Sequence, residues 1–226
     1  MSDKLSAAPT TQSADDAEER GILFVVSSPS GGGKGTLIRR IRERVPRLGY
    51  SVSWTTRQPR TGERHGVNYF FVTLAEFIAA RERGEFLEWA EVHGHYYGTS
   101  RTVVASELAA GRDVILEIDV QGAAAVRAAA LDAVSIFILP PSYEVLRVRL
   151  IARKSESLDD LALRLRNARE EIEHYREFDY VVLNDEVERA SAQLASIVYA
   201  VLAERRRQEA LARRVLATFP DEAAPV

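Results

Sequence analysis

The chain has no cysteine, no excess of positive charge and no long apolar run, and each of these absences excludes a class of protein. Without cysteine there is neither a disulfide framework nor a thiolate metal site, which fits a reducing compartment. A formal net charge of −3 and a pI near 5.9 argue against a general nucleic-acid binder. No apolar segment approaches the roughly 20 residues of a membrane span. We therefore expect a soluble cytoplasmic protein with no nucleic-acid or membrane partner.

The two ends of the chain differ in composition from the rest. Residues 1–20 are polar, small and increasingly acidic, with neither the apolar core of a signal peptide nor an arginine-rich amphipathic face. We expect residues 1–20 to be a disordered tail and residues 218–226 to be a flexible end. The intervening residues 21–217 fit one domain with a substantial core, into which subdomains can be inserted.

Short β-rich runs alternate with longer helical stretches over most of the chain. The runs are almost continuously apolar, as in VILEI, SIFIL and YVVL, which is typical of buried parallel strands with helices on both faces. The pattern predicts an α/β fold with a parallel sheet covered by helices. The expected strands are residues 22–28, 50–54, 114–119, 134–139 and 180–183, and a helix is expected over residues 35–45.

Residues 57–100 have a different pattern, in which short mixed strands surround one helix. This pattern predicts an inserted, partly antiparallel α+β subdomain. Further along, an arginine-dense stretch and a long Ala/Leu/Arg/Glu stretch both look helical, and the second is expected to break once. The expected elements are strands at residues 69–72, 86–92 and 96–97, and helices at residues 74–83, 142–176 and 186–217.

The most informative segment is residues 22–36, ILFVVSSPSGGGKGT, where an apolar run becomes a glycine-rich turn that ends at Lys34. Gly31, Gly32 and Gly33 can adopt backbone conformations closed to other residues, so successive N–H groups can point into one concavity suited to phosphate oxygens. Lys34 adds a positive charge, and the helix that follows presents its N-terminus to the same anion. Together these features predict a binding loop for a polyphosphate.

The loop departs in two places from the strict pattern G-x-x-x-x-G-K-[ST]. Ser28 stands where the first glycine is expected, and Gly35 stands where a serine or threonine is expected. Thr36 supplies a hydroxyl one residue later, which can serve the shell of a Mg²⁺ ion through water. The alternative is a glycine-rich surface turn with an incidental lysine.

A second anion site is predicted in the segment SVSWTTRQPRTGE, where Arg57 and Arg60 are three residues apart in a turn. The planar fork of arginine makes bidentate bonds to phosphate oxygens, so the pair could grip a second phosphate. The hydroxyls of Tyr69 and Tyr97 could complete this cradle. The alternatives are two solvent-exposed arginines and two packing tyrosines.

From about Gly21 to Arg207 the chain resembles the guanylate kinases, which transfer the γ-phosphoryl group of ATP to GMP. The resemblance rests on SSPSGGGKGT, SVSWTTRQPRTGE, NYFFV, FLEWAEVHGHYYGTS, ILEIDVQG, SIFILPPS and DYVVLND, which occur in order and at the family's spacing. It implies a P-loop kinase core with an inserted GMP-binding subdomain and a helical lid. The implied parts are a core at residues 21–52, 101–140 and 177–217, an insert at residues 53–100 and a lid at about residues 141–176.

The resemblance also implies a guanine site, and the residues suit it. Guanine presents adjacent donors at N1 and N2, which one carboxylate can accept, and acceptors at O6 and N7, which hydroxyls can satisfy. Glu88 matches the carboxylate, Ser53 and Thr99 match the hydroxyls, and Asp119 is expected near the guanine amino group. Adenine would leave Glu88 facing acceptors, which favours GMP over AMP. Alternatively, Glu88 could face outward from its strand, and Thr99 could cap the helix that begins near Arg101.

The resemblance implies the remaining roles. The GMP phosphate is expected to bind Arg57, Arg60, Tyr69 and Tyr97. ATP is expected to bind Ser30, Gly31, Gly32, Gly33, Lys34, Gly35, Thr36, Arg153 and Asn184, although Asn184 could equally be a simple turn former. The expected catalytic residues, which neutralise charge on the transferring phosphoryl group, are Lys34, Arg57, Arg149, Arg153 and Arg164. Mg²⁺ is expected to enter with ATP and to lie near Thr36, through water, and near Glu117.

The chain departs from its relatives mainly in the expected lid, which reads IARKSE where a Gly-Arg-Gly turn is common. Ala152 and Lys154 are expected to stiffen this segment. Glu117 stands where an aspartate is common and reaches one methylene further. Tolerance of dGMP is expected, because no residue evidently reads the ribose 2′-hydroxyl.

Two rival interpretations remain, one from the same enzyme class and one from another functional class. The first is another nucleoside-monophosphate kinase, against which Glu88, Ser53 and Thr99 argue. The second is a catalytically inactive guanylate-kinase-like module that binds partner peptides, against which the intact glycines and Lys34 argue. The long C-terminal helix leaves room for a homo-oligomer.

Overall fold

The computed structural model describes residues 20–92, 94–129, 131–152 and 158–219, apart from the side chains of residues 158–160. Its centre is a sheet of five parallel strands in the order β2-β7-β1-β8-β9. Because parallel strands end at the same edge of a sheet, the loops after these strands meet at one side of the molecule. The strands are β1 Leu23–Ser27, β2 Gly49–Tyr50, β7 Val114–Glu117, β8 Ala133–Leu139 and β9 Tyr180–Leu183.

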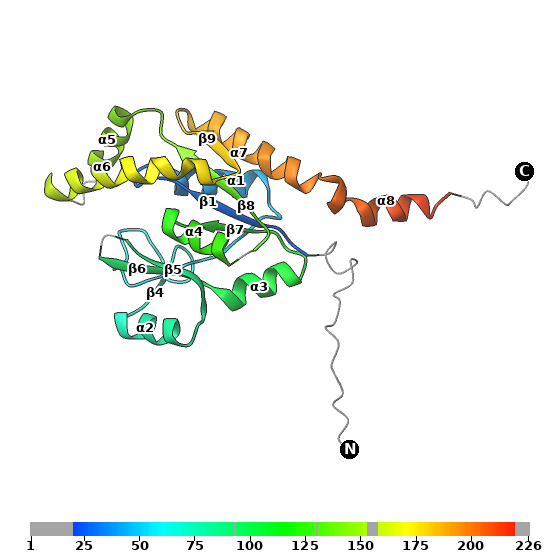
Figure 1. The fold of residues 1–226 in the computed structure, drawn as a ribbon, viewed down its shortest axis with the longest axis horizontal. Coiled ribbons are helices and arrows are strands. Elements are labelled where there is room, and N and C mark those ends of the chain that lie inside the picture. Colours follow the sequence, from blue (N-terminus) through cyan, green and yellow to red (C-terminus); the bar gives the residue numbers. More distant parts are fainter. Residues whose placement is uncertain (1–19, 93, 130, 153–157, 220–226) are drawn as a thin grey trace, which may run out of the picture.

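Helices cover both faces of this sheet (Figure 1). Successive residues of β1 point to opposite faces. Phe24 and Val26 are buried in the core under α1 and α7, and Leu23 and Val25 are buried in the core under α3 and α4. The predicted α/β fold with a helix-covered parallel sheet is therefore confirmed. The helices are α1 Lys34–Arg44, α3 Arg101–Ala109, α4 Val120–Ala128 and α7 Val187–Leu202.

A second, smaller sheet has four strands in the order β4-β3-β6-β5. The β3–β4 pair is parallel, and the β3–β6 and β5–β6 pairs are antiparallel, so the expected mixed pattern is present. Phe77 of α2 stacks on Phe86 of β5 with ring centroids 4.6 Å apart, which fixes α2 on this sheet. The elements are β3 Trp54–Thr55, β4 Phe70–Phe71, α2 Leu74–Glu82, β5 Phe86–Val92 and β6 His95–Ser100.

The two helices that come next after β8, α5 and α6, have an apolar cluster of their own. Leu146 and Leu150 of α5 pack against Ala168 of α6 in a small apolar cluster. The expected break in the C-terminal helical region lies around η2, after which α8 projects away from the body (Figure 1). In the described part of the chain, no helix combines the length and apolar character needed to cross a membrane. The elements are α5 Tyr143–Ala152, α6 Leu158–Glu173, η1 His174–Glu177, η2 Arg205–Arg207 and α8 Glu209–Leu216.

The expected single strand at residues 50–54 is wrong, because this segment is shared between the two sheets. The N–H of Ser51 still donates to the carbonyl of Ile115 beside β7, at 3.2 Å. The carbonyl of Ser53 instead accepts from the N–H of Phe70 beside β4, at 2.9 Å. The chain therefore crosses from the large sheet to the small one between Ser51 and Ser53, both of which are buried.

The expectation that the run YVVL is buried is wrong for most of its residues. Tyr180, Val181 and Leu183 are between 37% and 41% exposed, whereas Val182 is fully buried. β9 is the last strand of the sheet and pairs with β8 alone. An apolar run predicts a strand of a covered sheet, but it does not distinguish the centre of the sheet from its edge.

Candidate active site

A cavity of about 640 Å³ opens between the carboxyl edge of the parallel sheet, the small sheet and α6. It is lined by the glycine-rich loop after β1, by the end of β7 and by side chains of β5, β6 and α6. Most of the predicted site residues line it, namely Ser30, Gly31, Gly32, Gly33, Lys34, Gly35, Ser53, Arg57, Arg60, Tyr69, Glu88, Tyr97, Glu117, Asp119 and Arg164.

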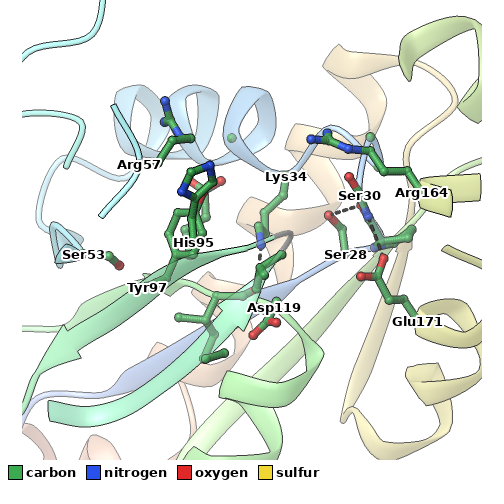
Figure 2. A pocket seen from close by; sticks show the side chains of 18 of the residues that line it. Ser28, Ser30, Lys34, Ser53, Arg57, His95, Tyr97, Asp119, Arg164 and Glu171 are labelled. Carbon is green, nitrogen blue, oxygen red and sulfur yellow. Dashed lines mark hydrogen bonds between the residues drawn. The ribbon is translucent and has the colours of Figure 1, made fainter. Parts of the chain in front are cut away.

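The lining side chains fall into two groups, which Figure 2 shows on opposite sides of the view. Arg57 and Tyr97, from the small sheet and its loop, lie on one side, and Ser30 and Arg164 lie on the other. Lys34 is between them. A single cavity thus brings the predicted polyphosphate loop and the predicted second anion site together.

The shape of the phosphate loop depends on two of its glycines. Gly31 and Gly33 have φ values of 84° and 92°, in the left-handed region that favours glycine. Side chains would also collide with their surroundings. A Cβ atom on Gly31 would lie 2.9 Å from Leu150 Cδ2, and one on Gly33 would overlap the side-chain amide of Asn184. The alternative of an incidental surface turn does not fit so tightly packed a loop.

Lys34 is the first residue of α1, and its side chain extends into the cavity toward the end of β7 (Figure 2). Its Nζ donates a hydrogen bond to the carbonyl of Ile118, at 2.6 Å. An ammonium group has three donors, so this bond orients Lys34 and leaves donors for an anionic ligand.

Asn184 and Arg149 lie against the phosphate loop but are not part of the cavity lining. Nδ2 of Asn184 donates to the carbonyl of Gly32 at 2.7 Å, and Nη2 of Arg149 donates to the carbonyl of Asn184 at 2.8 Å. Asn184 is buried, and its Oδ1 has no hydrogen-bond partner among the described residues. Both side chains therefore support the loop from behind, and Asn184 is more than a turn former.

Glu88 lies on β5 and is 5% exposed, so the alternative that it faces outward is wrong. The hydroxyl of Thr99, on the neighbouring strand β6, donates a short hydrogen bond to Glu88 Oε1. Burial raises the pKa of Glu88 to about 7; the charge of Asp119 adds to the rise, and Thr99 and Lys34 oppose it. A carboxylate with so little water around it suits a ligand that offers it hydrogen-bond donors.

Thr99 is itself fully buried and is not part of the cavity lining. Its hydroxyl orients Glu88 in this structure. The alternative that Thr99 caps α3 is wrong, because the cap is Ser100, whose Oγ accepts from the N–H of Val103 at 3.4 Å. Ser53 is buried and lines the cavity.

Gly122 of α4 lies where the two acidic side chains meet. Its N–H donates to Asp119 Oδ1 at 2.8 Å, so Asp119 caps this helix as well as lining the cavity. A Cβ atom on Gly122 would lie 2.6 Å from Glu88 Oε2 and 3.2 Å from Asp119 Oδ1. These distances are below van der Waals contact, so a glycine here leaves room for both carboxylates.

Arg57 and Arg60 lie in the loop that follows β3, and Glu63 organises this loop. Nη2 of Arg57 lies 3.0 Å from Glu63 Oε1, and the N–H of Arg60 donates to Glu63 Oε2 at 2.8 Å. The Arg57 guanidinium also lies 5.4 Å from the centroid of the Tyr69 ring. Because the Arg57 side chain is 11% exposed, it is not simply a solvated arginine, whereas Arg60 is exposed at the cavity rim.

The remaining predicted residues lie elsewhere. Thr36 is exposed on α1 and is not part of the cavity lining. Ala152 is exposed at the end of α5. Arg153 and Lys154 lie outside the described residues, and the expected stiffening of this segment stays a prediction.

The sequence interpretation missed Glu63, Gly122 and Glu171. An acidic residue six positions after Arg57 in a short loop was a usable signal for an ion pair. Gly122 sits in an otherwise ordinary first turn of a helix, and Glu171 sits in a run of mixed charges, so neither had a distinctive spacing.

Comparisons with known proteins agree with this geometry. The family model of guanylate kinase matches residues 20–201. The guanylate kinase of Aromatoleum aromaticum is 52% identical over 180 residues, covering 80% of this chain and 88% of that protein. The guanylate kinase of Dechloromonas aromatica is 50% identical over 200 residues, covering 87% of this chain and 99% of that protein. The crystal structure of guanylate kinase from Anaplasma phagocytophilum is similar with a TM-score of 0.72 at 34% identity, covering 90% of this chain and 98% of that one. The chain therefore belongs to the guanylate kinase family.

Proposed function

We propose that this protein transfers the γ-phosphoryl group of ATP to GMP, giving ADP and GDP. One observation carries the proposal: Lys34 and the phosphate loop line the same cavity as the buried carboxylate of Glu88. A polyphosphate at the loop and a guanine at Glu88 would then lie in one cavity of a size usual for small-molecule sites. The names of the relatives, which are guanylate kinases, support the same reaction.

In this proposal the residues divide between the two substrates. The phosphates of ATP bind along the N–H groups of the loop and the start of α1, with Lys34 as the positive charge. The guanine of GMP binds Glu88, Ser53 and Asp119, with Thr99 orienting Glu88. The phosphate of GMP is bound by Arg57, Arg60, Tyr69 and Tyr97.

Transfer requires alignment and charge neutralisation more than proton removal, because the accepting oxygen of GMP is already anionic. Lys34, Arg57 and Arg164 line the cavity and would neutralise the charge between the two phosphates. Arg149, which lies behind the loop, and Arg153 are proposed to complete the positive surroundings of ATP. We also propose the division into core, insert and lid that the family resemblance implies.

Mg²⁺ is proposed as the ion that accompanies ATP, and Glu117 fits it. A Cβ atom on Gly35 would lie 3.2 Å from Glu117 Oε1, so the glycine leaves room for this carboxylate beside the start of α1. Protein-bound Mg²⁺ typically has one or two carboxylates together with substrate phosphates and water. Thr36, which is exposed outside the cavity lining, fits less well. When bound, the ion would neutralise phosphate charge.

Phosphorus NMR of a reaction mixture tests the proposed transfer. With ATP, Mg²⁺ and GMP, we expect ADP and GDP signals to grow together while free phosphate stays near background, because the acceptor is GMP and not water. Omitting GMP should stop ADP formation. Growth of free phosphate without GDP would contradict the proposal and indicate a hydrolase.

Gly122→Ala is expected to impair GMP binding selectively. The added methyl group must displace the Glu88 carboxylate, and a shift of about 1 Å in a site can lower activity about 10²-fold. We therefore expect the KM for GMP to rise by about tenfold or more and the KM for ATP to stay within about twofold.

Initial rates with each substrate varied in turn measure this effect. Ala124→Ser, at an exposed position of the same helix, is the matched control. An unchanged KM for GMP in Gly122→Ala would contradict the inferred contact between Gly122 and Glu88.

A further inference from the structure

Glu171 makes a contact that none of the roles above explains. It lies near the end of α6, and its Oε2 accepts a hydrogen bond from the N–H of Ser30 in the phosphate loop, at 2.9 Å. The two residues are 141 positions apart in the sequence. Both line the cavity, and Figure 2 shows them side by side.

The same helix carries Arg164 into the cavity. Arg164 and Glu171 are seven residues apart, which is about two helical turns, so they lie on one face of α6. Both line the cavity with the loop. A second attachment of α6 is apolar, through Ala168 against Leu146 and Leu150 of α5. Apolar packing is not directional, whereas the bond from Ser30 fixes where this face of α6 sits against the phosphate loop.

A carboxylate is an unexpected neighbour for a phosphate site, because its charge repels a phosphate. Burial raises the pKa of Glu171 and the charge of Asp119 adds to the rise, whereas the hydrogen bond from Ser30 and the charges of Lys34 and His174 oppose it. The bond from Ser30 needs only an acceptor oxygen, which a carboxylate and a side-chain amide both supply. Replacing Glu171 with glutamine or with alanine can therefore separate the hydrogen bond from the charge.

We propose that Glu171 is a positioning residue that holds the first half of the phosphate loop through the N–H of Ser30 and thereby sets the place of Arg164 beside ATP. The inference rests on the proposed ATP site. Glu171 itself touches neither reacting phosphate in this scheme, and it acts through the loop backbone and α6.

The test compares Glu171→Gln, which keeps an acceptor and loses the charge, with Glu171→Ala, which loses both. Glu170→Ala, an exposed neighbour on α6, is the matched control. Two readouts need no turnover: amide hydrogen exchange over residues 30–33 in the ligand-free protein, and the Kd for ATP without GMP. The third is kcat with GMP. Thermal unfolding of each variant shows that it is folded.

We expect Glu171→Ala to speed exchange at Ser30, to weaken ATP binding about tenfold and to lower kcat about tenfold or more. Glu171→Gln should stay within about threefold of the unchanged protein in all three readouts, since its amide oxygen can accept from Ser30. Equal impairment of both variants would overturn the proposal by making the charge decisive, and so would an unchanged exchange rate and Kd in Glu171→Ala. Failure of the proposed function would instead appear as absent turnover in the unsubstituted protein.

Discussion

Replacing Lys34 with alanine is expected to lower kcat about 10³-fold while the protein remains folded, because the loss of a preorganised charge at the transferring group typically costs 10²–10³-fold. Lys34 is held by Ile118 inside the cavity and lies between the two proposed phosphate sites. Positioning and charge neutralisation do most of the work in phosphoryl transfer, so no other group can replace the missing ammonium fully. Steady-state rates at saturating ATP and GMP measure the effect.

The control for this substitution is Arg39→Ala, which removes a positive charge from an exposed position of the same helix. It should leave kcat unchanged within about twofold, as is usual for surface substitutions. A Lys34→Ala enzyme that kept more than about a tenth of the original kcat would contradict the catalytic role of Lys34.

Replacing Glu88 with glutamine is expected to lower kcat/KM for GMP about 10³-fold or more, because a site built around hydrogen bonds discriminates strongly when a partner is lost. The amide keeps one acceptor oxygen but presents an NH₂ donor to the second guanine donor, so one of the two bonds is replaced by a repulsive contact. The KM for ATP should stay nearly unchanged, since the phosphate loop is on the other side of the cavity. Equal effects on both substrates would rule out a base-reading role for Glu88.

The same substitution is expected to raise stability at neutral and alkaline pH. Burial raises the pKa of Glu88 from 4.5 to about 7, so the ionised side chain is destabilising in the folded state. Below pH 4.5 the Glu88 carboxyl group is neutral in the folded and the unfolded state, so its contribution to the free energy of unfolding is fully present. That contribution is lost as the pH rises from 4.5 through about 7. The free energy of unfolding of Glu88→Gln should therefore exceed that of the unsubstituted protein increasingly between these pH values.

Urea unfolding at pH 5 and pH 8 measures this difference. Glu91→Gln, on the exposed side of the same strand, is the matched control. If Glu88→Gln were no more stable at pH 8 than at pH 5, relative to the unsubstituted protein, the raised pKa of Glu88 would be wrong.

Much of the fold was predictable because local patterns carried the information. Apolar runs gave four of the five strands of the parallel sheet to within a residue or two, and the glycine-rich turn before Lys34 marked the phosphate loop. The strand at residues 50–54 was mispredicted because local composition does not reveal that Ser51 pairs beside β7 while Ser53 pairs beside β4.

The sequence predicted which residues share the candidate site where one residue type suits one ligand group: Lys34, Arg57 and Glu88 all line one cavity, and their roles stay predictions. The site was not predictable where the role of a residue depends on contacts between distant segments. In the sequence, Glu171 is one acidic residue in a run of charges, and only the folded structure shows that it contacts Ser30. Gly122 likewise resembles any other helix residue in the sequence, and only the structure shows that two carboxylates lie beside it. Such roles follow from tertiary packing, whereas the periodicity of apolar residues in a sequence indicates only secondary structure.

The preference among nucleoside monophosphates tests the central claim most directly. A coupled assay of ADP release with ATP and Mg²⁺ would compare GMP, AMP, CMP and UMP as acceptors. Each acceptor would be measured with the unsubstituted protein and with Lys34→Ala as the control. We predict that ADP formation requires GMP and falls about 10³-fold in the variant, with AMP disfavoured by about 10³-fold or more in kcat/KM. Turnover of AMP, CMP or UMP equal to or faster than that of GMP would contradict the recognition of guanine by Glu88. GMP binding without turnover would contradict the proposed kinase activity.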